Sequence, residues 1–416
     1  MKSIRLIDNV EDWVGGIPKG WNRVPLKRIA WKLNRPTRPD DPIVVCTNKG
    51  KAEYRGEKSP GLVSLTGNGY QGVLSEDLLI HGMDTWHGAI AVSDISGQCT
   101  SVVHVCDSNE NKRFLSYYLR ALSFRGVYKA FSNGVRQNTS DFRSWMKAGE
   151  IPVVLPSLEA QRRIANYLDE KCAQIDRAIE AAEGSIEEYK AYKESIVSRA
   201  VTKGLDKHVE MKDSGIEWLG WIPAHWSKTP IKRMFYISKT IAGKTGFDVL
   251  SITQRGLKVK DITSGEGQLA ADYSNYQIVE PGDFAMNHMD LLTGWIDVSD
   301  RSGVTSPDYR VFKARRENID KRYYLRVFQY YYFGRIFYGF CKGISSKGRW
   351  RLPADAFRNM QAPVPPLDEQ RRIADYLDER CAQIDRAIAV KKSIIADLKA
   401  YKHSLIYEVV TGKREV

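Results

Sequence analysis

Two long segments of the chain repeat apolar residues at intervals of three and four, the heptad pattern of a helix that packs along another helix. In the first segment, from about Ser157 to Lys203, the pattern runs through Leu168, Cys172, Ile175, Ile179, Ala182, Ile186, Tyr189 and Ile196. In the second it runs through Leu377, Cys381, Ile384, Ile388, Ile395, Leu398 and Leu405. We expect ten of these to be the helix-pairing residues, namely Leu168, Ile175, Ile179, Ile186, Tyr189, Leu377, Ile384, Ile388, Ile395 and Leu398.

Each segment begins after proline, at Pro156 and at Pro365-Pro366, and proline is tolerated at a helix start. About 45 residues at 1.5 Å per residue make a rod of about 65–70 Å. Such a helix cannot bury its apolar stripe alone, so we expect the two helices to pair with each other. The domain between them would allow either orientation, and we favour an antiparallel coiled coil. The alternative is an ordinary long core helix in each domain. Length, polar flanks and the lysines Lys193 and Lys402 within the stripe disfavour that alternative.

The two helical segments belong to an internal duplication that covers nearly the whole chain. Residues 159–170, EAQRRIANYLDE, match residues 368–379, DEQRRIADYLDE, at an offset of 209. The segments that precede them also begin alike, with WVGGIP at 13–18 and WLGWIP at 218–223, at an offset of 205. The order along the chain is therefore globular domain, helix, globular domain, helix.

We expect an α+β fold with two repeated globular domains. The boundaries that the repeat suggests are 1–156 and 206–365 for the domains, and 157–205 and 366–416 for the helices that follow them. Aromatic residues such as Tyr324, Phe328 and Tyr331 recur at helical spacing, which predicts a helix packed on a sheet with these rings in the core.

Composition narrows the class of protein. Hydrophobic residues make up 43% of the 416 positions and charged residues 27%, which is enough apolar material for real cores. No apolar run approaches the length of about 18 residues that spans a bilayer, and the N-terminus has no signal-peptide core. The six cysteines show no Cys-x-x-Cys spacing, so we expect a reducing, cytoplasmic location, without disulfides or a zinc site.

The net charge of +13 lies almost entirely in the two globular segments. Residues 1–156 carry +6 and residues 206–365 carry +7, whereas the helical segments carry −1 and +1. A basic excess on two matched domains suggests a polyanion that both contact, and nucleic acid is the usual one. The alternative is a generic basic surface.

Catalytic motifs are either absent from the sequence or lack a residue or a structural context that they require. Gly243-Lys244-Thr245 lacks the glycine that a phosphate-binding loop needs five positions earlier, where Ser238 stands. Gly67 to Gly72 fits Gly-x-Gly-x-x-Gly, but a strand is expected after it, so a tight turn is the better interpretation. His81 and His87 have no neighbouring ligand cluster. We therefore expect no catalytic residue and no metal site in this chain.

The pattern resembles the specificity subunits of type I restriction–modification enzymes. The resemblance rests on the Ile-Pro-x-x-Trp motifs at 17–21 and 222–226, on the Gln-Arg-Arg-Ile-Ala helix starts that follow proline, and on the two-fold repeat. The first helix start departs slightly, with Glu159-Ala160-Gln161 where the second has Glu369-Gln370.

This resemblance implies that each globular domain is a target recognition domain that reads one half of a split site in duplex DNA. The paired helices would act as a spacer and dock two methyltransferase (modification) subunits, and restriction subunits that translocate DNA would join further out. S-adenosylmethionine, ATP and magnesium would belong to those partners, so no cofactor is expected in this chain. A membrane is not expected among its partners.

The duplication also suggests which residues contact DNA. Positions that hold phosphates should match between the halves, and positions that read bases should differ. Lys49 and Arg255 match in type, so we assign them to phosphate. The remaining candidates lie in divergent stretches and loops and are Arg55, Lys58, Asn68, Tyr70, Gln71, Arg136, Gln137, Asn138, Arg143, Lys258, Lys260, Gln268, Lys347, Arg349 and Arg351.

Two other classes of function stay open at this point. One is an enzyme, a nuclease or methyltransferase in its own right, for which methyl transfer by the purified chain would be the evidence. The other is a non-catalytic coiled-coil scaffold or RNA-binding module, which preference for RNA over duplex DNA would support.

Overall fold

The structure is a computed structural model of the 416-residue chain. It describes residues 13–38, 40–56, 69–131, 142–254, 256–262, 272–292, 294–341 and 351–416. The chain divides into two compact units. Unit 1 comprises residues 1–183 and 392–416, and unit 2 comprises residues 184–391. Each unit therefore contains one globular domain together with one part of each long helix.

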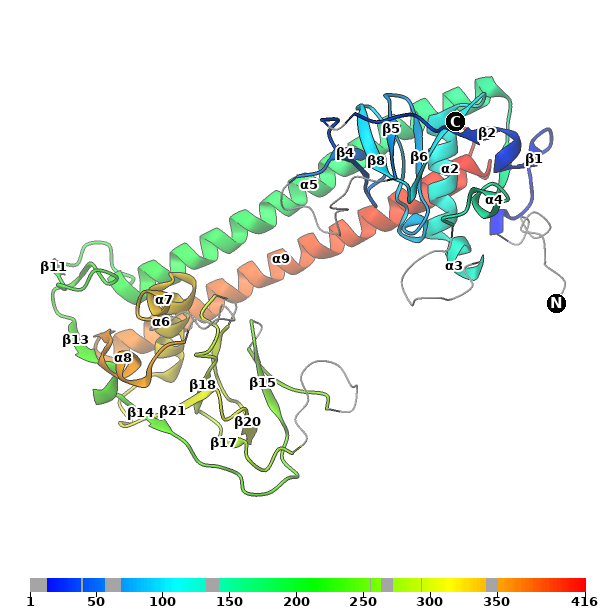
Figure 1. Cartoon of the computed structure of the whole chain (residues 1–416). Helices are drawn as coiled ribbons and strands as arrows, with labels where there is room; N and C mark the ends of the chain where they lie inside the picture. The colour runs from blue at the N-terminus through cyan, green and yellow to red at the C-terminus, as the bar shows by residue number, and fades with distance from the viewer. Residues whose placement is uncertain are drawn as a thin grey trace. The chain divides into compact units, whose positions relative to one another are not determined.

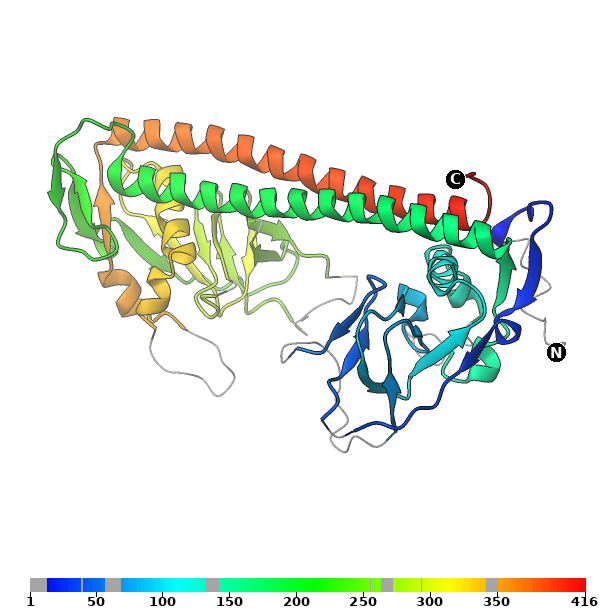
Figure 2. The same cartoon turned by 90° about the horizontal axis from the view of Figure 1, so that it is seen from above.

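The two long helices are present as the heptad pattern predicts. Helix α5 runs from Leu158–Lys203 and helix α9 from Leu367–Val410. In each unit the two helices lie side by side (Figures 1 and 2). In unit 1, Asp176 pairs with Lys402 at 2.6 Å and Glu183 with Lys399 at 3.7 Å. Residue numbers rise along α5 as they fall along α9, so the predicted antiparallel pairing is confirmed.

Unit 2 repeats this arrangement with the roles of the helices exchanged. Here Lys193 of α5 pairs with Asp385 of α9 at 2.6 Å, and Lys193 and Asp385 are the repeat equivalents of Lys402 and Asp176. The lysines that interrupt the apolar stripe are thus not unpaired charges inside it, because each one reaches an aspartate on the opposite helix.

Most of the apolar stripe is buried. Eight of the ten predicted helix-pairing residues are at most 9% exposed, and the other two, Tyr189 and Leu398, are half-buried and occupy the same position in the repeat. Leu377 and Cys381 belong to the core of the second domain. The stripe of each helix therefore packs against the globular domain near the helix start and against the opposite helix further along.

Both globular domains have the same sheet topology. In the first, a four-stranded antiparallel sheet has the order β2 (Ala30–Lys32), β9 (Val103–Ser108), β6 (Leu78–His81) and β7 (Ile90–Val92). In the second, the order is β14 (Phe235–Ser238), β21 (Arg310–Ala314), β18 (Phe284–Met286) and β19 (Ile296–Val298). The registers of the two sheets match at an offset of 206 residues between Ile80–His104 and Met286–Arg310.

Two-stranded pairs surround each sheet. In the first domain they are β3 (Val44–Cys46) with β4 (Ala52–Tyr54), β5 (Tyr70–Val73) with β8 (Gly97–Thr100), and β1 (Asn22–Pro25) with β10 (Pro152–Leu155). Their counterparts are β15 (Leu250–Thr253) with β16 (Gly256–Val259), β17 (Gln277–Val279) with β20 (Gly303–Thr305), and β13 (Ser227–Pro230) with β22 (Gln361–Val364). The second domain also has β11 (Met211–Asp213) paired with β12 (Trp221–Pro223).

One amphipathic helix covers each sheet (Figure 1), α2 (Lys112–Phe124) in the first domain and α6 (Lys321–Phe333) in the second. The predicted core rings Tyr324, Phe328 and Tyr331 on α6 are each fully buried, so the prediction that they pack in the core is confirmed. The shorter helices are α3 (Val127–Phe131), α4 (Trp145–Ala148), α7 (Ile336–Gly339), α8 (Ala354–Asn359) and the single turns η2 (Leu26–Arg28), η3 (Thr85–His87) and η4 (Ile231–Arg233).

The repeated glutamine at the start of each long helix joins that helix to its domain. The side chain of Gln370 accepts a hydrogen bond from the backbone N–H of Asp320, the N-cap of α6, at 3.0 Å and donates to the Pro365 carbonyl at 2.9 Å. Gln161 makes the equivalent bonds to Asn111 and Pro156, each at 3.0 Å. Both glutamines are buried, whereas the two arginines that follow each of them are exposed.

Among the described residues, no helix is long and apolar enough to cross a membrane.

We expect the Gln370→Leu substitution to lower the free energy of unfolding by about 2–4 kcal/mol. The change leaves the Asp320 N–H and the Pro365 carbonyl buried without partners, at about 1–3 kcal/mol each. Urea unfolding of the full chain, followed by tryptophan fluorescence, measures the effect. The matched control is Arg372→Leu, two positions along on the exposed face, which should change stability by no more than about 0.5 kcal/mol. Equal losses in the two variants would contradict this role of Gln370.

Candidate nucleic-acid interface

The first group of candidate residues lies on the β3–β4 hairpin and its equivalent, β15–β16. Lys49 is exposed in the tight turn of the first hairpin, where the Thr47 N–H donates to the Lys51 carbonyl at 2.9 Å. Gly50 follows it with φ +75°, and a Cβ there would stand 2.3 Å from the buried Arg120 guanidinium carbon. The turn therefore requires glycine, and it presents Lys49 to solvent. Arg255, the residue matched to Lys49, lies outside the described residues.

The hairpins carry further basic residues at equivalent positions. The backbone N–H of Arg55 donates to the Ile43 carbonyl and that of Lys260 donates to the Val249 carbonyl, both at 2.8 Å. Each of these two side chains is half-buried, while Lys258 on β16 is exposed. The fold thus brings Lys258 and Lys260 together on one hairpin and places Lys49 and Arg55 on the matching hairpin of the other domain.

Gln71, which we expected to contact DNA, is buried inside the first domain. It is 5% exposed on β5, and its side-chain amide donates to the Val103 carbonyl. Gln277 at the equivalent position of β17 donates in the same way to the Tyr309 carbonyl at 2.7 Å. Two glutamines with the same buried bond in both halves maintain the fold, so Gln71 is not part of the candidate surface. Its neighbour Tyr70 is half-buried.

Arg143 and Arg351 are both exposed and lie near the end of the central sheet of their domains. Each is next to a residue whose backbone N–H bonds to the loop after the third sheet strand, Phe142 to Gly82 and Leu352 to His288, both at 3.0 Å. The other candidates, namely Lys58, Asn68, Arg136, Gln137, Asn138, Gln268, Lys347 and Arg349, lie outside the described residues.

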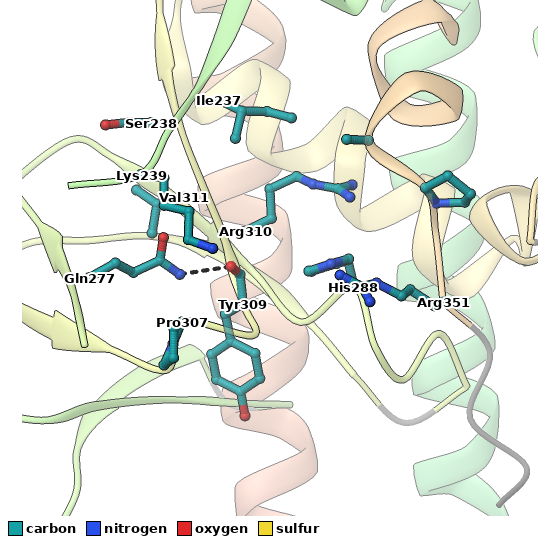
Figure 3. Close-up of a pocket in the computed structure, with 12 residues that line it drawn as sticks. Ile237, Ser238, Lys239, Gln277, His288, Pro307, Tyr309, Arg310, Val311 and Arg351 are labelled. Atoms are coloured by element: carbon teal, nitrogen blue, oxygen red, sulfur yellow. Dashed lines mark hydrogen bonds between the residues drawn. The ribbon is translucent and has the colours of Figure 1, made fainter. Parts of the chain in front are cut away.

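The sequence analysis missed a basic cavity in the second domain. It has a volume of about 400 Å³, and Lys239, His288, Tyr309, Arg310 and Arg351 are among the residues that line it (Figure 3). Arg310 is 5% exposed and His288 is 6% exposed. No sequence motif marks these residues, because they come from different elements and only the fold of the sheet brings them together.

Burial and like charges shift the titration of both residues. Burial, with Arg310, Arg351 and Lys239 nearby, lowers the pKa of His288 to about 3, so its imidazole is neutral at physiological pH. Burial lowers the pKa of Arg310 to about 10, with Arg351 and Arg358 adding to the effect, so its guanidinium remains charged.

The remaining chemistry of the described residues gives no support to catalysis of its own. Among them, no three His, Cys, Asp or Glu side chains gather as metal ligands. All six cysteines are free. Burial raises the pKa of the Cys99 thiol to about 12 and raises that of Cys46 and Cys106 as well, which makes these thiols weak nucleophiles.

The lowered pKa of His288 predicts acid sensitivity. Below about pH 6.5 the unfolded chain takes up a proton on this imidazole and the folded chain does not, so stability is lost as the pH falls. By pH 5 the loss from this one residue is about 2 kcal/mol.

Urea unfolding of the full chain at pH 7.5 and pH 5.0 measures this loss. The His288→Asn variant should lose about 2 kcal/mol less than the unchanged chain between the two pH values, and His208→Asn, which changes an exposed histidine, should behave like the unchanged chain. The same pH dependence in all three proteins would rule out the effect.

Comparison with models of known protein families gives no match. Curated proteins do match. The chain is 26% identical over 284 residues to the type I restriction enzyme MjaVIII specificity subunit of Methanocaldococcus jannaschii, which covers 64% of this chain and 63% of that protein. It is 24% identical over 326 residues to the putative type I restriction enzyme MjaX specificity subunit of the same organism, with 74% of this chain and 70% of that protein covered. The first match thus spans less than two thirds of that relative's length.

A solved structure has the same fold. It comes from work on complex assembly and conformational transition of the type I R-M system, and it superimposes with a TM-score of 0.70 over 96% of this chain and 100% of that chain, at 15% identity. The likeness in sequence extends through much of the duplicated chain and agrees with the repeated fold. The chain is therefore similar in sequence to type I restriction enzyme specificity subunits, and it shares its fold with that solved structure.

Proposed function

We propose that this chain directs a type I restriction–modification complex to its DNA sequence, with each globular domain recognising one half of a bipartite duplex site. The observation that carries the proposal is the repetition of one domain fold with a basic excess of +6 and +7 in the two copies. Two copies of one DNA-recognition domain that differ in their surface residues are suited to two different half-sites.

The hairpins and the sheet ends supply the proposed contacts. Exposed Lys49 and Lys258 stand on equivalent hairpins and are suited to phosphates, and exposed Arg143 and Arg351 near the sheet ends are suited to either phosphates or base edges. The candidates outside the described residues remain part of this proposal. Gln71 does not, because its amide is occupied in the interior.

The long helices are the proposed docking site for two modification subunits. Tyr192 and Tyr401, which are equivalent in the repeat, are 46% and 49% exposed on α5 and α9, and Val390 and Ile394 on α9 are also exposed. Apolar side chains on the outside of a paired helix are suited to a protein partner. S-adenosylmethionine, ATP and magnesium act on the partner subunits in this proposal, and the chain itself is not catalytic.

A salt titration tests the proposed DNA contacts. Binding of a mixed-sequence DNA duplex by the full chain should weaken with salt, with a slope of about −0.9 in log affinity against log salt for each phosphate contacted. Lys49→Gln and Lys258→Gln should each make the slope about 1 less steep. Lys190→Gln on α5 is the matched control and should leave the slope unchanged.

A slope near zero, or the same loss in the Lys190 control, would contradict phosphate contact by the hairpins. Tighter binding of an RNA duplex than of the DNA duplex would favour an RNA-binding module over the proposed function.

The length of the helix pair should set the spacing of the two half-sites. In unit 1 Asp176 faces Lys402 and Glu183 faces Lys399, so residues 177–183 of α5 stand opposite residues 395–401 of α9. Deleting both heptads preserves the apolar register and shortens the pair by about 10 Å. The spacer between half-sites should then shrink by about 3 base pairs, at 3.4 Å each.

Mapping of methylated sites, with the chain assembled with its modification subunits, measures the spacer. Duplicating both heptads is the matched control and should lengthen the spacer by about 3 base pairs. An unchanged spacer in both variants would show that the length of the helices does not set the spacing between the half-sites.

A further inference from the structure

The basic cavity of the second domain has the properties of a binding site. Lys239, His288, Arg310 and Arg351 line it, and the twelve described residues around it include no aspartate or glutamate. In Figure 3 the ends of Arg310, His288 and Arg351 lie on the same side of strand β21. The cavity therefore concentrates positive charge without an acidic partner in its lining.

Arg310 is the central group. It extends from β21, and one of its terminal nitrogens, Nη2, donates to the Leu352 carbonyl at 2.8 Å. Its guanidinium carbon stands 4.9 Å from the centre of the Phe357 ring. The other terminal nitrogen, Nη1, is buried and has no hydrogen-bond partner in the described structure. A buried guanidinium without a carboxylate is costly, and an anion that enters the cavity would relieve that cost.

His288 provides a second unused group. Its Nδ1 is buried and lacks a hydrogen-bond partner among the residues that the structure describes. Gln277, by contrast, uses both of its side-chain N–H groups, which donate to the Ser306 and Tyr309 carbonyls at 2.7 Å each; Figure 3 shows the bond to Tyr309. The free donors of the cavity are thus on Arg310 and His288, with exposed Lys239 and Arg351 beside them.

The first domain has a histidine and no arginine at the same position, and the Nδ1 of that residue, His104, is also buried without a hydrogen-bond partner in the described structure. The strand register places His104 where the second domain has Arg310, and its Nε2 is 2.7 Å from the carbonyl of Phe142, the equivalent of Leu352. Burial lowers the pKa of His104, which favours a neutral ring. His288 is replaced by Gly82, where an added Cβ would stand 2.8 Å from the Phe142 carbonyl.

Lys239 is likewise replaced, by Asn34, as the register of β2 and β14 shows. The hydrogen bond that maintains the fold is therefore available without arginine. The second domain has the charged Arg310, the buried His288 and the exposed Lys239 at this place, which is more than the fold requires.

We propose that this cavity binds a phosphate group carried on a nucleotide, with Arg310 Nη1 and His288 Nδ1 as buried donors and Lys239 and Arg351 at its edge. Arginine is the side chain best suited to phosphate oxygens, and a neutral histidine can donate from one ring nitrogen. The cavity of about 400 Å³ exceeds the volume of one phosphate group, and Ile237, Pro307 and Val311 give it apolar walls that a sugar or base can contact.

The nucleotide has two possible sources, the DNA backbone and a free nucleotide, and the chemistry of recognition is the same for both. The inference does not require the proposed function, because it rests on the cavity alone.

The test uses the full chain and two kinds of probe, radiolabelled ATP without magnesium in equilibrium dialysis and a mixed-sequence DNA duplex in a salt titration. Arg310→His introduces the residue of the first domain and removes the unused donor. The double variant Lys239→Asn with Arg351→Gln changes only exposed side chains, so it reports on the site even where Arg310→His alters folding. Lys207→Gln, an exposed lysine of the same unit, is the matched control.

If the ligand is a free nucleotide, the unchanged chain should bind about one ATP, and both cavity variants should weaken this binding at least tenfold. If the ligand is DNA, ATP should not bind, and both variants should make the salt slope of duplex binding about 1 less steep. In either case the Lys207 variant should match the unchanged chain.

The proposal is overturned if ATP does not bind and duplex binding is the same in the unchanged chain and both variants. That result would leave the proposed function intact, provided that the unchanged chain binds duplex DNA. ATP binding that depends on the cavity in a chain that does not bind DNA would support the cavity and contradict the proposed function.

Discussion

The structure depends on the burial of the apolar stripe that runs along each of the two long helices. These helices are too long and too polar to be stable alone. Each stripe is covered by its own domain near the helix start and by the opposite helix further along. Because the helices are antiparallel, each compact unit needs residues from both of them, and unit 1 is completed only by residues 392–416 at the far end of the chain. The hydroxyl of Tyr407 there donates to the Trp13 carbonyl at 3.1 Å, so the last helix holds the first domain.

The duplication separates residues that maintain the fold from residues that differ for another reason. Gln161 and Gln370 make the same buried bonds at the two helix starts, and Gln71 and Gln277 make the same buried bond inside the two domains. A polar residue that is buried, satisfied and repeated is explained by the cost of leaving backbone groups unpaired. Arg310 and its equivalent His104 are both buried and satisfied only in part, but a histidine makes the bond to the equivalent carbonyl in the first domain, so the fold alone does not account for the arginine.

The same comparison connects structure to the proposed reading of DNA. The hairpins, the sheet order and the covering helix are shared, and the hairpins hold the half-buried basic residues Arg55 and Lys260 at equivalent places in the two domains. Rigid, repeated elements can position residues that differ between the copies, which is what a protein with two recognition domains requires. The long helices carry almost no net charge, so the basic surface that would attract DNA belongs to the domains.

The sequence by itself determined the duplication, both long helices and the core position of the rings on α6, because these follow from periodicity along the chain. It also led to the resemblance to type I specificity subunits. The antiparallel orientation of the helices was expected, but both orientations are compatible with the periodicity, and the ion pairs between the helices decided it. The sequence could not place Gln71 in the interior, since a glutamine in a divergent stretch looks the same whether its amide faces solvent or a backbone carbonyl. Only the tertiary structure brought Arg310, His288, Lys239 and Arg351 together, because their proximity depends on strand register and on which side chains the sheet buries.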